Sequence, residues 1–214
     1  MTHPIWPLFD LGVITPRLSL RYVDDSLATE LATLAAAGVH DPSETPFLFS
    51  WTDIEPPEQQ RNTMRHHWEL KSQTTSAQWS LAFAVMVDGK AIGTTNVTAK
   101  DFPLLRTVST GSWLGQAFQG RGFGTELRRA TLTLAFSGLG AETAKTAAWH
   151  DNLGSLGVTR SLGYRPDGRD VERRRDRRDE MLSFTMDRSQ FDNLDTSDIE
   201  LLGIDEARRF LEID

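Results

Sequence analysis

The chain has 214 residues, of which 39% are hydrophobic and 25% charged, so it is long enough to bury a core and has the composition of a globular protein. It contains no cysteine, which excludes disulfide bonds, thiolate metal sites and a cysteine nucleophile. The net charge of −7 argues against a protein built mainly to bind nucleic acid.

The two ends of the chain bear on location and domain organisation. No apolar run approaches the roughly 18 residues of a membrane span, and the first residues lack a signal-peptide pattern, so we expect a cytoplasmic protein without a membrane partner. Eight carboxylates and two arginines give residues 192–214 a net charge of −6. We expect a single domain over 1–190 and an acidic helical tail over 191–214, which would dock on that domain or on another subunit of a homo-oligomer.

Hydrophobic periodicity predicts alternating strands and helices along the domain. In chain order the patterns predict a strand at 17–23, a helix at 25–38 capped by Asp24 or Asp25, an ordered loop at 40–57, a helix at 58–73, strands at 79–87, 90–100 and 106–114, a helix at 123–136, a strand at 143–149, a helix at 152–162 and a last strand at 180–186. Between the last two elements, residues 172–180 comprise five arginines and four acids, which is typical of a solvated hairpin. This order indicates a mixed α/β fold, with a central sheet covered by helices.

The most informative segment is a glycine-rich turn between a strand and a helix, at Gln119-Gly120-Arg121-Gly122-Phe123-Gly124-Thr125. Glycines let main-chain N–H groups approach a ligand closely, and the first turn of a helix offers unpaired N–H donors to phosphate. The dinucleotide pattern G-x-G-x-x-G fails because its last position is Thr125, and no P-loop ending is present. The residues alone leave open whether this turn binds a phosphate or only closes a corner between strand and helix.

Six ordered segments of the chain resemble the GNAT N-acetyltransferases, and in particular their RimJ/RimL branch. These are Thr15–Arg21, Ile92-Gly93, Gly111–Leu114, the Q-x-x-G-x-G pattern at Gln119–Gly124, Asn152 with Ser155, and Leu162-Gly163-Tyr164. The resemblance implies the GNAT fold, an α+β fold with a mostly antiparallel twisted sheet and helices on both faces. Segments near Trp6 and Lys100 are also similar to an actinobacterial subgroup that includes an enzyme described as a succinyltransferase.

The resemblance also implies a co-substrate, acetyl- or succinyl-coenzyme A, and the residues that bind it. The implied coenzyme A-binding residues are Trp113, Leu114, Gln119, Gly120, Arg121, Gly122, Phe123, Gly124, Thr125 and Asn152. Ser155 is the implied catalytic residue, as the donor of a proton to the departing thiolate, although Asn152 and Ser155 are also ordinary residues for a helix cap. No metal is expected, because the adjacent His66 and His67 point in different directions from a helix.

This chain departs from the family at two positions used for proton transfer. Thr159 stands where many members have a tyrosine acid, and Ser109 and Thr110 stand where a glutamate base is often found. We therefore expect an N-acyltransferase in which an amine attacks the thioester directly, with a catalytically silent coenzyme A-binding module as the alternative. The acceptor amine, which is a protein N-terminus, a lysine or a small molecule, is left open, and no nucleic-acid partner is expected.

Overall fold

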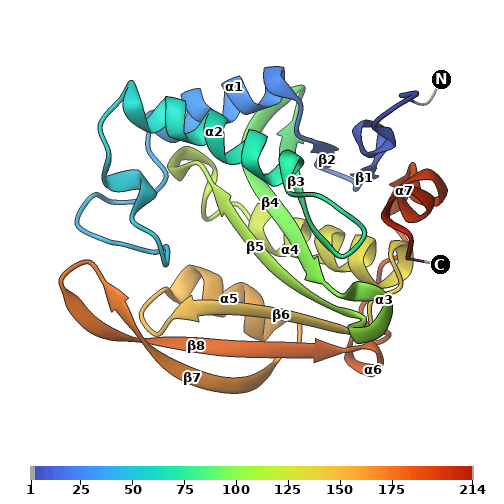
Figure 1. Cartoon of the computed structure of the whole chain (residues 1–214). Helices are drawn as coiled ribbons and strands as arrows, with labels where there is room; N and C mark the ends of the chain where they lie inside the picture. Colours follow the sequence, from blue (N-terminus) through green and yellow to red (C-terminus); the bar gives the residue numbers. More distant parts are fainter. Residues whose placement is uncertain (1–2, 214) are drawn as a thin grey trace.

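The computed structural model describes residues 3–213, and its centre is a nine-stranded sheet in the order β7-β8-β6-β5-β4-β3-β2-β1-β9 (Figure 1). Every neighbouring pair is antiparallel except β5 and β6, which are parallel. The strands are β1 Gly12–Ile14, β2 Ser19–Tyr22, β3 Gln78–Val87, β4 Lys90–Lys100, β5 Thr107–Leu114, β6 Thr143–Trp149, β7 Arg165–Arg174, β8 Arg177–Asp187 and β9 Glu200–Leu202. This mixed, mostly antiparallel sheet confirms the expected fold class.

Helices cover both faces of the sheet, as the sequence predicted. They are α1 Asp25–Ala36, α2 Glu58–Ser72, α3 Phe102–Leu105, α4 Phe123–Thr133, α5 Leu153–Ser161, α6 Arg188–Phe191 and α7 Ile204–Leu211. Strand β3 shows why two layers form, because its side chains alternate between the faces. Leu81, Phe83 and Val85 pack in the core that includes Leu127 of α4. Their neighbours, such as Ala82 and Ala84, pack with residues of α1 and α2. Figure 1 shows these two helices side by side against the sheet.

Most predicted elements lie within a few residues of the observed ones. Asp24 is the N-cap of α1, where its Oδ1 accepts a hydrogen bond of 2.8 Å from the N–H of Leu27. The predicted helix 123–136 is observed as α4, followed by a π-helical turn at Leu134–Gly138. Within residues 3–213, no helix is long and apolar enough to cross a membrane.

Three strands were not predicted from the sequence. Strands β1 and β9 have only three residues each, too few for a recognisable alternation. Strand β7 is exposed along nearly its whole length and is rich in arginine. Because neither face of the strand is buried, its sequence lacks the alternation of apolar and polar residues from which a strand is predicted. It forms the outer strand of a hairpin with β8, and the charged segment 172–180 is the turn end of that hairpin.

The C-terminal segment packs on the rest of the chain. Its strand β9 pairs with β1, and Leu202, which falls within the expected helical tail, lies in this strand instead. Helix α7 begins only at Ile204, and its residues Ala207 and Leu211 are fully buried in the main core. Of the two docking alternatives for this segment, the structure therefore shows the one on the same domain.

Candidate active site at the fork between strands β5 and β6

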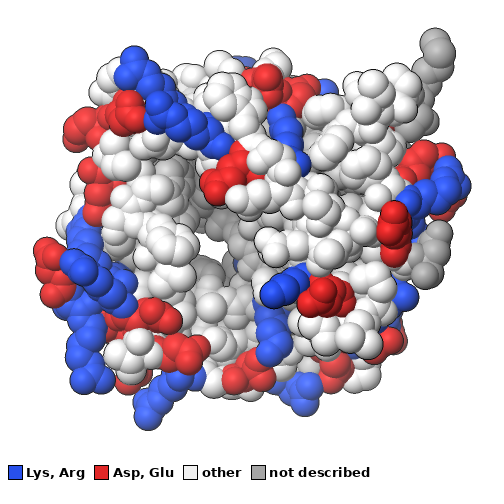
Figure 2. Space-filling model, viewed as in Figure 1, with Lys and Arg blue, Asp and Glu red and all other residues white. Residues whose placement is uncertain are grey.

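The parallel strands β5 and β6 pair over a short stretch and then diverge (Figure 1). The last paired residues are Ser109 of β5 and Lys145 of β6. A cavity of about 940 Å³ opens at this fork, lined by β5, by the beginnings of α4 and α5, by the loop after α1 and by the turn of the β7–β8 hairpin. Figure 2 shows the opening as a hollow near the middle of this face, surrounded mostly by uncharged side chains.

Strand β5 presents free main-chain groups to this cavity. The N–H of Gly115 donates to the carbonyl of Ile92 on β4. Because the main-chain N–H and C=O groups of successive residues alternate between the two edges of a strand, those of Leu114 and Ser112 face the edge of β5 that lies away from β4. Two recorded contacts agree with this direction: the Thr110 carbonyl accepts from Thr146 of β6, and the Leu114 carbonyl accepts from Gln119. Because β6 no longer pairs at this level, the N–H groups of Ser112 and Leu114 face the cavity without a partner strand.

Trp113 contributes its side chain to the site and not its main-chain groups. Its main-chain groups turn toward β4, so only its side chain is available to the cavity. That side chain is partly buried and lies 5.7 Å from the ring of Trp51, in the loop after α1. Trp113 is thus a wall of the cavity, and its neighbours Ser112 and Leu114 carry the free donors.

The glycine-rich turn lines the cavity with main-chain groups. Gly120 and Gly122 have φ of 71° and 80°, a conformation that side chains with a Cβ rarely adopt. Gly122 is the N-cap of α4 and supplies no side-chain acceptor, so the first N–H groups of the helix, at Phe123, Gly124 and Thr125, have no partner within residues 3–213. These donors and the helix dipole favour an anion at this position.

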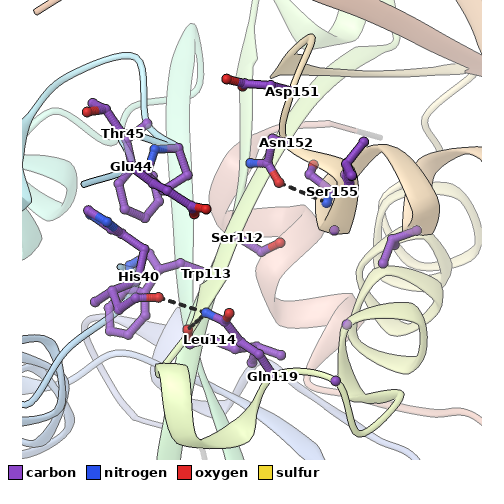
Figure 3. A pocket seen from close by; sticks show the side chains of 18 of the residues that line it. His40, Glu44, Thr45, Ser112, Trp113, Leu114, Gln119, Asp151, Asn152 and Ser155 are labelled. Atoms are coloured by element: carbon purple, nitrogen blue, oxygen red, sulfur yellow. Dashed lines mark hydrogen bonds between the residues drawn. The ribbon is translucent and has the colours of Figure 1, made fainter. Parts of the chain in front are cut away.

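Gln119 holds this turn in place. Its Nε2 donates to the Leu114 carbonyl at 2.8 Å and to the Val39 carbonyl at 2.7 Å, which ties the turn to β5 and to the end of α1 (Figure 3). The Arg121 side chain is exposed and lies over the ring of Phe118, and its guanidinium forms no ion pair within residues 3–213. The structure therefore shows Gln119 as a clamp, whereas Arg121 is exposed and is not among the residues that line the cavity.

Helix α4 is anchored behind the turn by a buried carboxylate. Glu126 accepts a 2.6 Å hydrogen bond from Thr15 and another of 2.6 Å from the Nε of Arg17. Burial opposes the charge of Glu126, but these hydrogen bonds outweigh it and hold the pKa of the carboxyl below its ordinary value. The guanidinium of Arg17 also lies over the Phe123 ring and donates to the Arg121 carbonyl.

Helix α5 brings Asn152 and Ser155 to the opposite wall. Asn152 is the N-cap, and its Oδ1 accepts a 3.0 Å hydrogen bond from the N–H of Ser155 (Figure 3). The Ser155 hydroxyl lines the cavity, is partly exposed and has no hydrogen-bond partner within residues 3–213. Thr159, at the position of the family's tyrosine, is only 1% exposed and does not line the cavity.

Sequence reasoning missed Glu44, which belongs to the loop after α1. Its side chain projects into the cavity, toward the gap between Ser112 and Asn152 (Figure 3). Its carboxylate forms no hydrogen bond or ion pair with any residue of 3–213, unlike most carboxylates near the site. The loop carries no periodicity and lies far from the glycine-rich turn in sequence, so nothing in the sequence indicated that Glu44 reaches the cavity.

Several side chains fix the loop that carries Glu44. Trp149 donates to the Phe47 carbonyl at 3.1 Å, and the Nε of Arg174 donates to the Thr45 carbonyl at 2.8 Å. Arg175, at the hairpin turn, forms an ion pair of 2.8 Å with Asp53. These contacts close the cavity on one side and restrict the position of Glu44.

Two further acidic residues, Asp151 and Asp101, have other surroundings. Asp151 lines the cavity but pairs with the buried Arg174, both of its oxygens lying 2.8 Å from Nη1. Burial opposes the charge of Arg174, yet Asp151 and Asp179 raise the pKa of the guanidinium above its ordinary value. Asp101 follows the end of β4 and is not among the residues that line the cavity. No group of three or more His, Asp or Glu side chains within residues 3–213 is arranged to hold a metal ion.

Comparison with known proteins identifies related folds. A family model described as "Acetyltransferase (GNAT) domain" matches residues 17–165. RimL, described as a ribosomal alpha-N-protein acetyltransferase in complex with coenzyme A, is a similar solved structure, with a TM-score of 0.66 and 17% identity. The match covers 81% of this chain and 96% of that one. Mycobacterium smegmatis RimJ, solved with a coenzyme A disulfide, has a TM-score of 0.67 and 16% identity, over 84% of this chain and 88% of that one.

Proposed function

Because the chain belongs to the GNAT acetyltransferase family and resembles its RimJ/RimL branch, we propose that it transfers an acetyl or succinyl group from acyl-coenzyme A to an amine. The observation that carries the proposal is the meeting of two sets of free main-chain donors in one cavity. One set is the first turn of α4 with the glycine-rich turn, and the other is the open edge of β5. We also propose a cytoplasmic location, where the acyl-coenzyme A pool lies.

In this proposal the main-chain donors and several of the implied residues have physical roles. The N–H groups from Gly120 to Thr125 bind the diphosphate, and the exposed Arg121 adds a charge from outside the cavity. The pantetheine arm then runs along β5 like an added strand, between Leu114 on one side and Asn152 on the other. One of the free N–H groups of Ser112 and Leu114 donates to the thioester oxygen as negative charge develops there.

The reaction proceeds by direct attack within a ternary complex. The nitrogen of the amine attacks the thioester carbon, the carbon–sulfur bond breaks, and the sulfur leaves as a thiolate. Glu44 takes the proton that the attacking nitrogen loses, directly or through a water molecule. The Ser155 hydroxyl gives a proton to the thiolate and recovers one from solvent. Most of the rate enhancement comes from holding the amine and the thioester together, since positioning alone supplies roughly 7–11 kcal/mol in favourable cases.

A second candidate function is a catalytically silent module that binds coenzyme A without transferring its acyl group. The burial of Thr159, where many members have an acid, favours it. Release of free thiol from acetyl- and succinyl-coenzyme A separates the two functions when it is measured with a panel of amines that includes protein N-termini, lysine peptides and polyamines. Binding without amine-dependent thiol release across this panel would support the silent module.

The acceptor class proposed first is an amine on a protein. RimL is described as acting on a ribosomal protein, and RimJ is the second similar structure of this branch. The apolar side chains of Leu48 and Phe49 are exposed in the loop next to Glu44, where an acceptor peptide would pass. Peptides with free and blocked N-termini, assayed in parallel, distinguish the N-terminal amine from lysine.

The coenzyme A site is tested by two substitutions of the same size at Thr125, which is exposed in the first turn of α4. T125E places a carboxylate beside the proposed diphosphate, whereas T125Q adds the same bulk without charge. A carboxylate in the first turn stabilises a helix by about 0.3–1 kcal/mol, so T125E should fold at least as well as T125Q. We expect calorimetry to show coenzyme A affinity at least tenfold lower for T125E than for T125Q. Equal affinities would contradict a diphosphate at this helix end.

A further inference from the structure

Arg128 of helix α4 is a buried arginine that points into the fork. It is 5% exposed and lines the cavity. Its Nη1 donates to the hydroxyls of Thr146 at 2.9 Å and Thr110 at 3.3 Å, and its Nη2 lies 3.5 Å from the Ser112 hydroxyl. Thr110 and Thr146 follow the last paired residues of β5 and β6, so the guanidinium spans the point where the strands separate.

The partners of Arg128 are all neutral, which is unusual for a buried charge. No carboxylate of residues 3–213 lies within the 4.0 Å ion-pair distance of its nitrogens. Arg174 offers a direct comparison, because it is 7% exposed and pairs with both Asp151 and Asp179. A guanidinium has five N–H donors. The three hydrogen bonds of Arg128 leave two of these donors without a partner within residues 3–213.

The hydroxyls around Arg128 are also arranged to admit an anion. Thr110 donates its own proton to the Lys145 carbonyl, and Thr146 donates to the Thr110 carbonyl, so both hydroxyls offer the guanidinium only their lone pairs. The Ser112 hydroxyl has no acceptor within residues 3–213, and it lines the cavity. The guanidinium and this free hydroxyl together form a positively charged, hydrogen-bonding end to the cavity.

The position of Arg128 identifies which part of the ligand would reach it. Arg128 lies six residues after Gly122, a rise of about 9 Å along the helix, and is therefore distant from the diphosphate site. Along β5, Ser112 and Thr110 lie beyond Leu114, in the direction of the fork. This is the end of the cavity where the acyl group would lie if the pantetheine arm follows β5 as proposed above.

We propose that Arg128, with the Ser112 hydroxyl, binds a terminal carboxylate on the acyl group, and that the donor is therefore a coenzyme A thioester of a short dicarboxylic acid such as succinate. The inference rests on the proposed function, and it selects between the two donors left open there. A carboxylate would supply the missing counter-charge and accept the two free donors of the guanidinium. A neutral acyl group would leave that charge buried and unpaired.

The test compares succinyl-coenzyme A with butyryl-coenzyme A, which has the same chain length and no carboxylate. We expect calorimetry to show that the wild type binds the succinyl thioester at least tenfold more tightly, the range of a charge-assisted hydrogen bond. R128M, which is similar in length and uncharged, should remove this preference, and R128K should keep part of it. S112A keeps the charge and should reduce the preference by a few-fold.

The outcomes separate this inference from the function on which it rests. Tight binding of acetyl- or butyryl-coenzyme A without a preference for the succinyl thioester overturns the inference and leaves the acyltransferase proposal standing. Equal loss of affinity for both thioesters in a folded R128M also overturns it, because that result assigns Arg128 a purely structural role at the fork. Failure to bind any coenzyme A thioester overturns both. The wild-type preference is measurable without any variant, so a variant that fails to fold does not prevent a decision.

Discussion

Replacing Gly93 by alanine should displace the main chain on which the thioester is proposed to lie. Gly93 is buried in β4 opposite Leu114, and a Cβ at this position would lie 2.2 Å from the Trp113 carbonyl oxygen and 2.9 Å from the Leu114 Cα. Real Cβ atoms essentially never approach other atoms to less than 3.0 Å, and two of the three obstructing atoms are main chain, the third being the Cδ2 of Leu114. Strand β5 must therefore move by about 1 Å away from β4, into the cavity.

Two effects of different size follow from that shift. Overpacking of this kind costs about 1–3 kcal/mol of folding free energy, which for a domain of this length lowers the melting temperature by a few degrees. Misplacement of the donors of Ser112 and Leu114 by about 1 Å should lower kcat/KM by about 100-fold. G93A is thus expected to be folded at 25 °C and to have lost most of its activity.

The assay measures kcat/KM by thiol release and stability by thermal unfolding of the same preparations. The matched control is G157A, because Gly157 lies in α5, and a Cβ there has no atom within 4 Å. We expect G157A to gain about 0.5–1 kcal/mol of stability and to keep activity close to wild type. A folded G93A with wild-type kcat/KM would refute the reasoning, because the geometry of β5 would then have no bearing on the thioester.

Three further predictions concern single side chains. Burial lowers the pKa of His67 to about 4, so as pH falls below 6.5 this histidine is protonated in the unfolded chain before it is protonated in the folded protein. The free energy of unfolding should therefore drop by about 3 kcal/mol by pH 4, and chemical denaturation of H67L should show a smaller drop. R174M removes the buried partner of two carboxylates and should lower the free energy of unfolding by about 3 kcal/mol, with part of it restored by the additional change D179N. E44Q should lower kcat about 100-fold near neutral pH. This deficit in kcat should shrink as pH approaches the pKa of the acceptor amine, because more of the amine is then already deprotonated. A deficit that stays constant at all pH values would argue against a role of Glu44 as base.

The sequence alone predicted the parts of the site that depend on local chemistry. The glycines at 120 and 122 indicated a turn between strand and helix, and the amphipathic run after them indicated the helix that begins there; the structure shows both, with positive φ at the two glycines. Asn152 was recognised as a cap, which it is. Strand β3 was found because both of its faces are buried and its sequence is correspondingly apolar. In each case the physical cause acts within a few residues of the chain.

The tertiary structure decided which distant side chains meet at the fork. Glu44 reaches the cavity because Trp149 and Arg174, more than a hundred residues later in the chain, hold its loop. Arg128 is one of several arginines in the sequence, and nothing near it shows that its guanidinium is buried among hydroxyls from two strands. The divergence of β5 and β6 is itself a property of pairing between separate segments. Local sequence thus determines turns, caps and amphipathic faces, whereas burial and the absence of a counter-charge arise only when separate segments pack together.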